Sequence, residues 1–494
     1  MKQYLLGIDV GTTGTKTLLF SAKGELLGYA YRPYELHTPQ VGYSEQNAED
    51  WWNAVCDTVR EVCADPKIAR SVVAISLSLQ GGTMVAVDQE GNPVRPAIVW
   101  NDGRGEAQNA SYIQEVGKAD TMYQKTGWRL GKAMLALEIR WMRENEPALF
   151  DKTAKFLSVP DYISMRMTGI PAVDLSDGGI NQLVNIRTGQ YDPDILKFAG
   201  ITEDQLPKIV HSGDVIGNLT ASAAKALGLS TNTVLVAGAH DQYAVALGAG
   251  ALNEGDILIG SGTCWVVTAI GDEPAFETGL SQSVSAVPGK WGSLLSLSSG
   301  GVCLEWWRRN LTVNHDGSLL SFDMINEEVA KRKAAENGLF FYPFSGKAAP
   351  GLKFTKASFI GLDLSHDRFD IARAIMEGVV FQVRWMMESF KTTPSKEGLK
   401  LSGGASKSAL WCQMVADITN RPVRIPEVAD LACVGAAILA GTGCGIYLNV
   451  EEGYKHLAVS ERILYPNPAN VAKYEKLYAE YKAKADLLGA VYGL

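Results

Sequence analysis

The stretch from Tyr4 to Phe20, YLLGIDVGTTGTKTLLF, combines the residue types that bind a phosphate group. Its glycines let backbone N–H groups come close to an anion, its threonines donate hydrogen bonds, and its lysine adds a positive charge. These residues are Gly11, Thr12, Thr13, Gly14 and Lys16. A Walker loop needs adjacent Gly and Lys followed by a helix, whereas here Thr15 intervenes and an apolar run follows. We therefore expect two strands joined by a phosphate-binding hairpin, with an ordinary tight hairpin and a solvated lysine as the alternative.

A second segment that could do chemistry follows the apolar run from Thr233 to Ala237. This segment, residues 238–242, reads Gly-Ala-His-Asp-Gln. The run predicts a strand, so Asp241 is expected at the tip of a sheet. A carboxylate there can take the proton of a hydroxyl that attacks a phosphoryl group. The alternative is that Asp241 caps the helix predicted behind it.

The opening pattern returns in the middle of the chain. Residues 256–260, DILIG, enter Ser-Gly-Thr at 261–263, and residues 264–270, CWVVTAI, leave as a strand. A repeated strand, polar hairpin and strand predicts two related domains that face each other across a ligand cleft.

Two glycines stand at a predicted junction between a strand and a helix. Residues 400–405, KLSGGA, end in Gly403 and Gly404, and Ser408 opens the helix ALWCQMVADIT. Glycines at such a junction let a flat or anionic ligand lie against the backbone at the positive end of the helix.

Polar side chains follow two further predicted strands. Residues 72–79 form an apolar run that ends before Gln80, and PAIVWNDGR at 96–104 carries Asn101, Asp102 and Arg104. Their donors and acceptors suit a polyhydroxylated molecule. Loops at the carboxyl ends of strands bind ligands in sheets of this kind. The alternative is plain turn formation, because Asn-Asp-Gly is a strong turn signal.

The rest of the chain alternates between the periodicities of strands and helices, which predicts an α/β protein. A strand is expected at 26–34. Helices are expected at 135–146, 159–169, 433–445 and in the tail from 466 to 494, whereas 195–230 reads as helices and loops.

Composition excludes several classes of protein. The 494 residues allow two or three domains. With 46 Lys and Arg against 54 Asp and Glu, the net charge of −8 favours neither nucleic acid nor an anionic membrane as a partner. The N-terminus lacks the pattern of a signal peptide, and no apolar run is long enough to cross a bilayer. The seven cysteines show no C-x-x-C pair, which indicates reduced thiols in the cytoplasm.

The segment GIDVGTTGTK resembles the first phosphate motif of the actin, hexokinase and heat-shock-chaperone superfamily. Together with the Asp241 region, the segment 357–377 and LSGGASKSALWCQMVAD at 401–417, it resembles the FGGY family of carbohydrate kinases along essentially the whole chain. Within that family, WNDGR and ADITNRPV look most similar to xylulokinases. The resemblance implies two RNase H-like domains, at 1–250 and 251–446, followed by a helical tail at 447–494.

The resemblance also implies an ATP-dependent sugar kinase, with D-xylulose or another pentulose as substrate and Mg²⁺ as metal. Asp241 would be the general base and Asp9 would position Mg²⁺. The phosphates of ATP would be held by Gly11, Thr12, Thr13, Lys16, Gly262 and Thr263. The adenosine would lie against Gly403, Gly404 and Ala405, near Ser408. The sugar would contact Gln80, Gly81, Gly82, Trp100, Asn101, Asp102, Asp241 and Gln242.

Three departures from the family pattern bear on the substrate. Xylulokinases carry Met and His where this chain has Gly81 and Gly82, the first family signature carries Lys where Glu138 stands, and a Ser-Gly-Glu-Arg-Thr-Pro motif is replaced at 345–350. Another ketose, a sugar alcohol or a sugar acid therefore stays open as substrate. A sugar sensor or a chaperone-like ATPase on the same fold are the alternatives of another class. We expect a homodimer.

Overall fold

The computed structural model describes residues 2–131, 134–276, 280–312, 317–333, 338–344, 356–457 and 460–491. The chain divides into two compact units, one of residues 1–252, 272–292 and 428–458 and the other of residues 253–271, 293–427 and 459–494. The predicted α/β organisation with two domains is confirmed. The predicted boundaries after residues 250 and 446 stay predictions, and the motif at 345–350 lies outside the described residues.

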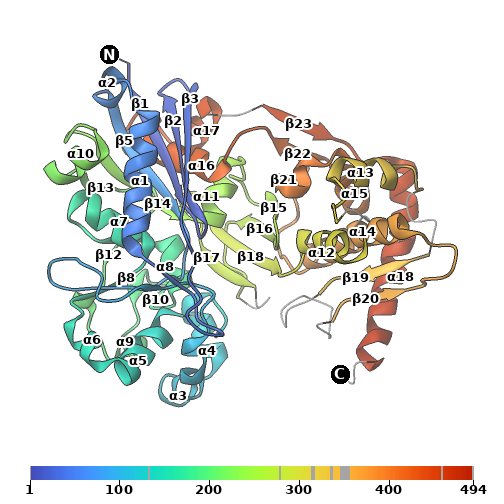
Figure 1. Cartoon of the computed structure of the whole chain (residues 1–494), viewed down its shortest axis with the longest axis horizontal. Helices are drawn as coiled ribbons and strands as arrows, with labels where there is room; N and C mark the ends of the chain where they lie inside the picture. Colours follow the sequence, from blue (N-terminus) through green and yellow to red (C-terminus); the bar gives the residue numbers. More distant parts are fainter. Residues whose placement is uncertain are drawn as a thin grey trace. The chain divides into compact units, whose positions relative to one another are not determined.

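The first unit is built on a mixed six-stranded sheet in the order β13-β14-β5-β1-β2-β3 (Figure 1). Its strands are β1 Tyr4–Val10, β2 Gly14–Ser21, β3 Leu26–Pro33, β5 Val72–Leu79, β13 Val215–Asn218 and β14 Val234–His240. Its principal helices are α1 Ala48–Val62, α7 Val159–Thr168, α8 Leu175–Asn181, α11 Asp241–Gly248 and α16 Leu431–Gly443. β1 pairs antiparallel with β2 and parallel with β5, as a hairpin flanked by a crossover strand requires.

Side chains alternate along β1, so the two faces of the strand pack against different helices. Leu6 joins the core cluster that contains residues of α1, and Leu5 joins the cluster that contains residues of α16. A Cβ atom at Gly7 would lie only 1.9 Å from the Cys433 carbonyl oxygen, so α16 approaches the backbone of β1 directly. Asp9 shares the face of Leu5 and Gly7 and is therefore directed toward the side of the sheet that α16 covers.

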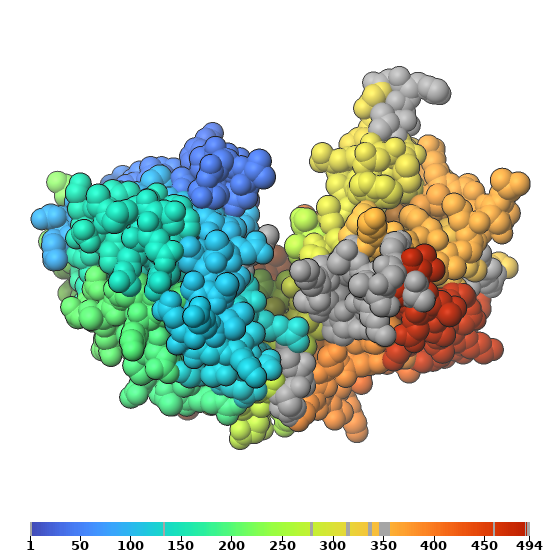
Figure 2. Space-filling view, turned by 90° about the horizontal axis from the view of Figure 1, so that it is seen from below, coloured from blue at the N-terminus to red at the C-terminus, as the bar shows by residue number. Residues whose placement is uncertain are grey.

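A subdomain of small strands and short helices is inserted between β5 and β13. It contains β6 Val85–Val87, β7 Ala97–Ile98, β8 Lys155–Leu157, α3 Asn109–Glu115, α4 Ala119–Thr126, α5 Leu135–Asn145, α6 Pro147–Lys152 and α9 Pro193–Ala199. Its segments form a continuous surface of the first unit, cyan to green in Figure 2. A separate apolar cluster fills its interior, which includes Met134, Ile139 and Phe198.

The second large sheet has seven strands in the order β17-β18-β16-β15-β21-β22-β23. The strands are β15 Ile257–Ser261, β16 Trp265–Gly271, β17 Ser281–Val284, β18 Trp291–Leu297, β21 Leu399–Gly403, β22 Val423–Pro426 and β23 Glu461–Leu464. The helices of the second unit include α12 Gly301–Leu311, α13 Phe322–Ala330, α14 Arg368–Met387, α15 Ala409–Thr419 and α18 Pro468–Val491. β15 pairs antiparallel with β16 and parallel with β21, as β1 does with β2 and β5, so the predicted repeat is confirmed.

One expectation for the first unit is wrong. The segment 195–230 contains β12 Lys208–Val210 and β13 as well as helices, and β13 pairs antiparallel with β14 at the sheet edge. Most of β13 is exposed or half-buried, with Val215 50% exposed, so it lacks the apolar alternation that marks a strand in sequence. No helix in the described part of the chain is both long and apolar enough to cross a membrane.

Candidate active site

Asp9 at the end of β1 is a buried carboxylate whose negative charge is only partly compensated by its neighbours. Its side chain accepts a hydrogen bond from the Ser78 hydroxyl at 2.9 Å and lies 3.3 Å from the Lys16 ammonium. Burial, then the nearby carboxylate of Asp430, raises the pKa of Asp9 to about 7, although Lys16 opposes the shift. A buried carboxylate with a raised pKa favours an added cation, because the cation offsets the cost of burying its charge.

Lys16 joins Asp9 to a second carboxylate. Its ammonium lies 2.7 Å from Asp430, which also caps α16 by accepting a hydrogen bond from the Cys433 N–H at 3.0 Å. Burial lowers the pKa of Lys16, but the carboxylates of Asp9 and Asp430 outweigh burial and raise it. Nothing local in the sequence predicts this pair, because 414 residues separate its members. An Asp before a helix of small residues signals only the cap.

The carboxylates of Asp9 and Asp430 fit a magnesium ion that keeps part of its coordination for phosphate and water. Carboxylate oxygens are the ligands that Mg²⁺ prefers, and Mg²⁺ is held by one or two carboxylates and substrate phosphates more often than by a protein cage. No group of three or more His, Cys, Asp or Glu side chains that could hold a metal ion gathers in the described part of the chain.

The hairpin after β1 uses some of its polar groups internally. The Gly11 N–H donates to the Gly14 carbonyl at 3.2 Å, so the expectation that this N–H faces an anion is wrong for the conformation seen. Gly14 is required for packing instead, because a Cβ atom there would lie 2.5 Å from the Tyr31 ring. The Thr13 side chain is exposed and the Lys16 side chain is 34% exposed, which leaves both able to meet a ligand.

Thr12 links the hairpin to the predicted sugar loops. Its hydroxyl donates to the Gln80 side-chain oxygen and accepts from the Trp100 indole N–H, both at 3.0 Å. Gln80 is buried and also donates to Gln46 at 3.2 Å. Trp100 is 48% exposed. The structure thus brings together Thr12, Gln80 and Trp100, which the sequence assigns to two different ligands.

Asp102 holds the protein together rather than facing a ligand. It is fully buried, and both of its oxygens are bonded to the Arg104 guanidinium, at 2.9 and 2.8 Å. It also accepts from the Ser44 N–H at 2.6 Å. The turn interpretation of this segment therefore describes Asp102 better than sugar binding does, whereas the neighbouring Asn101 is exposed.

Asp241 is the first residue of α11, directly after β14. Its side chain is 38% exposed and one oxygen lies 3.2 Å from the imidazole Nε2 of His240. His240, at the N-cap position, makes no capping hydrogen bond from its side chain. The charge of Asp241 contributes to the raised pKa of Asp9, so the two carboxylates lie within electrostatic reach of each other. Gln242 is half-buried beside Asp241.

The structure also places His240 and Asp177 beside the predicted site. A Cβ atom at Gly81 would lie 2.5 Å from Asp177 Oδ1 and 2.8 Å from His240 Cδ2, so Gly81 cannot accept a side chain without displacing them. Gly82 has φ of +71°, a conformation that glycine adopts without strain. The sequence signal for His240 is only its position before Asp241. The segment 174–179 is polar and ends in two glycines, which favours a loop that could line a cleft, but the structure forms α8 there and places Asp177 within it.

The second unit holds a separate pocket of about 580 Å³, a volume within the range of about 300–1,000 Å³ for small-molecule sites. Five residues that the sequence assigns to the nucleotide line it: Gly262, Thr263, Gly404, Ala405 and Ser408. Side chains of α12 and α13 complete its wall, and Phe322 and Leu304 give it an apolar surface.

Gly403 supports this pocket without lining it. Its φ is +92°, and a Cβ atom there would lie 2.8 Å from the main chain of Ser261. The Ala405 N–H donates to the Ser261 hydroxyl at 3.2 Å, and Ser408 caps α15 while it donates to Asn326 at 2.7 Å. The strand-to-helix junction and the second hairpin are therefore locked together.

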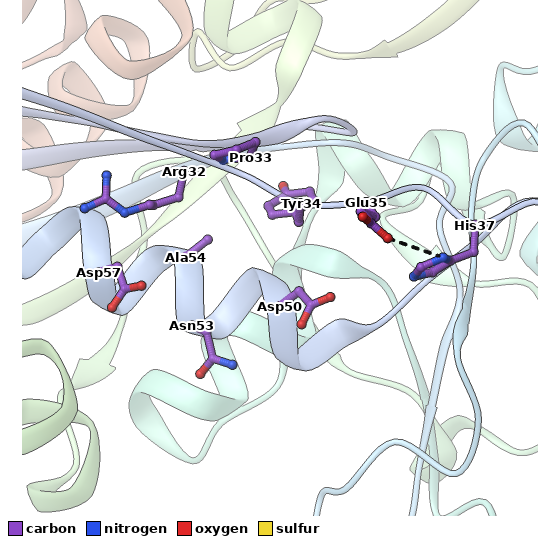
Figure 3. A pocket seen from close by; sticks show the side chains of 9 residues that line it. All are labelled: Arg32, Pro33, Tyr34, Glu35, His37, Asp50, Asn53, Ala54 and Asp57. Atoms are coloured by element: carbon purple, nitrogen blue, oxygen red, sulfur yellow. Dashed lines mark ion pairs between the residues drawn. The ribbon is translucent and has the colours of Figure 1, made fainter.

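A smaller hollow of about 340 Å³ lies between α1 and the chain after β3 (Figure 3). Figure 3 shows Tyr34, Glu35 and His37 on one side and Asp50 of α1 on the other, with Glu35 and His37 forming an ion pair at 4.0 Å. The Tyr34 hydroxyl donates to the Gly11 carbonyl, so this hollow backs onto the phosphate hairpin. None of the predicted site residues lines it.

Comparisons with known proteins agree with this arrangement. Residues 4–248 match the N-terminal domain, and residues 256–444 the C-terminal domain, of the FGGY family of carbohydrate kinases. The chain is 32% identical to a xylulose kinase of Bacillus subtilis, over 97% of this chain and 96% of that protein. It is 30% identical to an L-xylulose/3-keto-L-gulonate kinase of Escherichia coli, over 98% and 96%.

A solved structure gives the same result for the fold. The crystal structure of xylulose kinase from Rhodospirillum rubrum matches with a TM-score of 0.90 and 26% identity, and the match covers 100% of both chains. The predicted actin/hexokinase-like ATPase fold and the predicted kinase activity are thereby confirmed. The chain belongs to the FGGY family of carbohydrate kinases and is an ATP-dependent sugar kinase.

Proposed function

We propose that this enzyme transfers the γ-phosphoryl group of ATP to a hydroxyl of a pentulose, with D-xylulose as the first candidate. The observation that carries the proposal is Asp241, a part-exposed carboxylate at the tip of the sheet, within electrostatic reach of Asp9. Its relatives at about one-third identity include a xylulose kinase and an L-xylulose/3-keto-L-gulonate kinase, both of which are named for ketose substrates.

Asp241 acts as the general base in this proposal. Its free carboxylate oxygen accepts the proton of the sugar hydroxyl as that hydroxyl attacks the γ-phosphorus, and His240 holds the other oxygen in place at 3.2 Å. A base in this role needs to be charged and accessible, and the exposure of Asp241 meets the second condition.

Asp9, Asp430 and Lys16 would bind the metal and the phosphates of the nucleotide. Asp9, with Asp430, would hold Mg²⁺, which when bound neutralises the charge that develops on the phosphates. Lys16, Thr12 and Thr13 would contact those phosphates from the first unit, and Gly11 would shape the hairpin.

The pocket of the second unit would take the rest of the nucleotide. Gly262 and Thr263 would meet phosphate, and Gly404 and Ala405 would meet the adenosine, with Ser408 at its rim. Gly403 would keep the junction in the conformation that this contact needs. The pocket combines backbone groups with apolar side chains, which suits a flat base attached to a charged chain.

The sugar would be held by Gln80, Trp100, Asn101 and Gln242 around Asp241. Asp102 is left out of this set because its oxygens are fully bonded within the protein. Gly81 and Gly82 offer no side chain to the sugar. A sugar acid or a polyol is the second candidate substrate, because a relative at 30% identity is named for 3-keto-L-gulonate as well as for L-xylulose.

Location and assembly complete the proposal. All seven cysteines are free thiols, and five of them are buried. We place the enzyme in the cytoplasm, where ATP is available and thiols stay reduced. A homodimer stays a prediction.

ADP release in a coupled assay tests the proposed function directly. The purified chain is supplied with Mg-ATP and a panel of pentuloses, hexuloses, tetritols, pentitols and sugar acids, with a blank that contains no sugar. We expect release above the blank with one or a few compounds, and D-xylulose among them. Equal release with and without every compound would refute the proposal and favour a chaperone-like ATPase, and no release at all would favour a sugar sensor.

A further inference from the structure

Three buried polar groups near Asp241 lack a hydrogen-bond partner among the residues that the structure describes. Both carboxyl oxygens of Asp177, Nδ1 of His240 and Nε1 of Trp128 make no hydrogen bond. Asp177 is 0% exposed and His240 is 4% exposed. Buried polar groups are nearly always paired, so unpaired ones that gather beside a catalytic residue point to a ligand that completes them.

The three groups surround two glycines. A Cβ atom at Gly81 would lie 2.5 Å from Asp177 Oδ1 and 2.8 Å from His240 Cδ2, and one at Gly179 would lie 3.4 Å from Trp128 Nε1. The rings of Trp128 and His240 pack edge to face with their centres 6.3 Å apart. Although they come from three separate segments, these side chains form one cluster.

Hydrogen bonds between α8 and β14 fix the positions of Asp177 and His240. Asp174 caps α8 by accepting from the Ser176 N–H at 2.9 Å, and the Ser176 hydroxyl accepts from the His240 N–H, also at 2.9 Å. The Ser176 carbonyl accepts from the Ser283 hydroxyl at 2.9 Å. The start of α8 is therefore bonded to the end of β14, one residue before Asp241. The cluster is supported by the same scaffold as the catalytic residue.

The cluster offers both donors and an acceptor. Burial, then the carboxylates of Asp174, Asp161 and Asp241, raises the pKa of Asp177 well above its usual range, which favours its protonated form, with one donor and one acceptor. His240 directs Nε2 toward Asp241 at 3.2 Å, and an imidazole that donates from Nε2 keeps Nδ1 as an acceptor. The Trp128 indole adds a donor. Hydroxyls, which both donate and accept, match this set.

We propose that Asp177, His240 and Trp128 bind the sugar hydroxyls remote from the one that is phosphorylated, and thereby determine which polyol the enzyme accepts. The inference rests on the proposed function. His240 lies beside Asp241, which takes the reacting hydroxyl, and Trp128 and Asp177 lie near the imidazole of His240. Gly81 packs against Asp177 and His240 without a side chain, and two successive glycines allow a wider range of backbone dihedrals than other residues, so the sugar would approach the cluster past Gly81 and Gly82.

The variant Trp128→Phe isolates a single donor, because it keeps a ring and removes the N–H. Kinetics are measured with D-xylulose and with erythrulose, a ketose that is shorter by one CHOH group. We expect kcat/KM for D-xylulose to fall by about 3- to 10-fold, the effect of one neutral hydrogen bond. The value for erythrulose is expected to change less than about twofold, since it lacks a remote hydroxyl, and the KM for ATP is expected to stay unchanged.

Trp307→Phe is the matched control. The Trp307 indole N–H in α12 is also buried and unpartnered, and the ring is fully buried, but it lies in the second unit. This variant is expected to leave the ratio of the two sugars unchanged. Asp177→Asn, which keeps a donor and an acceptor, is expected to retain that ratio within about threefold, whereas Asp177→Ala loses it. Thermal unfolding shows whether each variant is folded.

The outcomes distinguish a failure of the proposed function from a failure of this inference alone. A wild type that responds to no sugar refutes the proposed function and this inference with it. An active wild type whose Trp128→Phe and Asp177→Ala variants lose activity equally on both sugars would overturn the inference alone, because such residues would only position Asp241. Unchanged kinetics in both variants would also overturn it.

Discussion

The buried carboxyl group of Glu138, in the first turn of α5, allows a direct test of whether burial raises the pKa of an unpaired acid in this protein. The side chain is 0% exposed, and neither oxygen has a hydrogen-bond partner among the described residues. Burial, then the charge of Asp102, raises its pKa well above the usual range, although Arg104 and Arg95 oppose the shift. Both arginines are already paired with other carboxylates. This environment therefore favours the protonated form of Glu138.

Replacing Glu138 by Met removes this unpaired group and keeps an unbranched side chain of similar length. A buried polar group without a partner costs about 1–3 kcal/mol, so Glu138→Met should be more stable at neutral pH by about that amount. The gain should depend on pH. The folded protein keeps a proton that the unfolded chain releases above about pH 4.3, so the wild type loses about 1.4 kcal/mol per pH unit from there up to the folded pKa.

Thermal unfolding at pH 5, 6, 7 and 8 measures the difference between wild type and variant, in which the titration of all other groups cancels. For units of this size about 1 kcal/mol shifts Tm by about 2–4 °C, so the gap should widen by about 3–6 °C per pH unit and then level off. Glu138→Gln should show the same pH dependence with a smaller gain, because it still buries a polar group. A gap that is constant with pH would refute the assignment of a neutral Glu138.

Three further predictions concern the ligand sites. Asp430→Asn keeps the helix cap but removes the charge beside Lys16. We therefore expect Tm to fall by about 2–4 °C and the KM for ATP to rise. A double-mutant cycle with Lys16→Met that shows no coupling between the two residues would contradict this prediction. Gly403→Ala forces a Cβ atom to within 2.8 Å of Ser261. The KM for ATP should therefore rise about tenfold, whereas the KM for the sugar should stay unchanged. An unchanged KM for ATP would exclude this junction from the nucleotide site. Gly82→His places a side chain at φ +71°, which costs about 1–2 kcal/mol of stability, and should alter sugar preference more than the KM for ATP. Unchanged sugar selectivity would remove Gly82 from the sugar pocket.

The elements with strong local patterns could be predicted from the sequence. β5 and α15 begin and end at the predicted residues, and both hairpins form where glycine and threonine interrupt apolar runs. The tip position of Asp241 follows from the apolar strand before it. In each case the signal lies within about a dozen residues, so period and turn chemistry suffice.

The contacts that determine the chemistry join residues far apart in the sequence, so local sequence patterns could not predict them. Asp430 reaches Lys16 only because α16 packs against β1 at Gly7, and no local signal encodes that approach. Asp102 carries a turn motif whichever role it plays, and only the fold shows Arg104 and Ser44 saturating its oxygens. The unpaired state of Asp177 likewise depends on what packs around it. Sequence identifies residue types at the site, and packing decides which of them stay free.

Phosphoryl transfer by wild type and by Asp241→Asn tests the central claim most directly. With the sugar that gives the strongest ADP release, phosphorylated sugar and ADP are quantified together, and ATP binding to both proteins is measured by calorimetry. We expect one phosphorylated sugar per ADP in the wild type, a loss of at least about 100-fold in the variant, and ATP affinity within about threefold. A variant that transfers phosphate at the wild-type rate would contradict the assignment of Asp241 as the base that accepts the proton of the sugar hydroxyl.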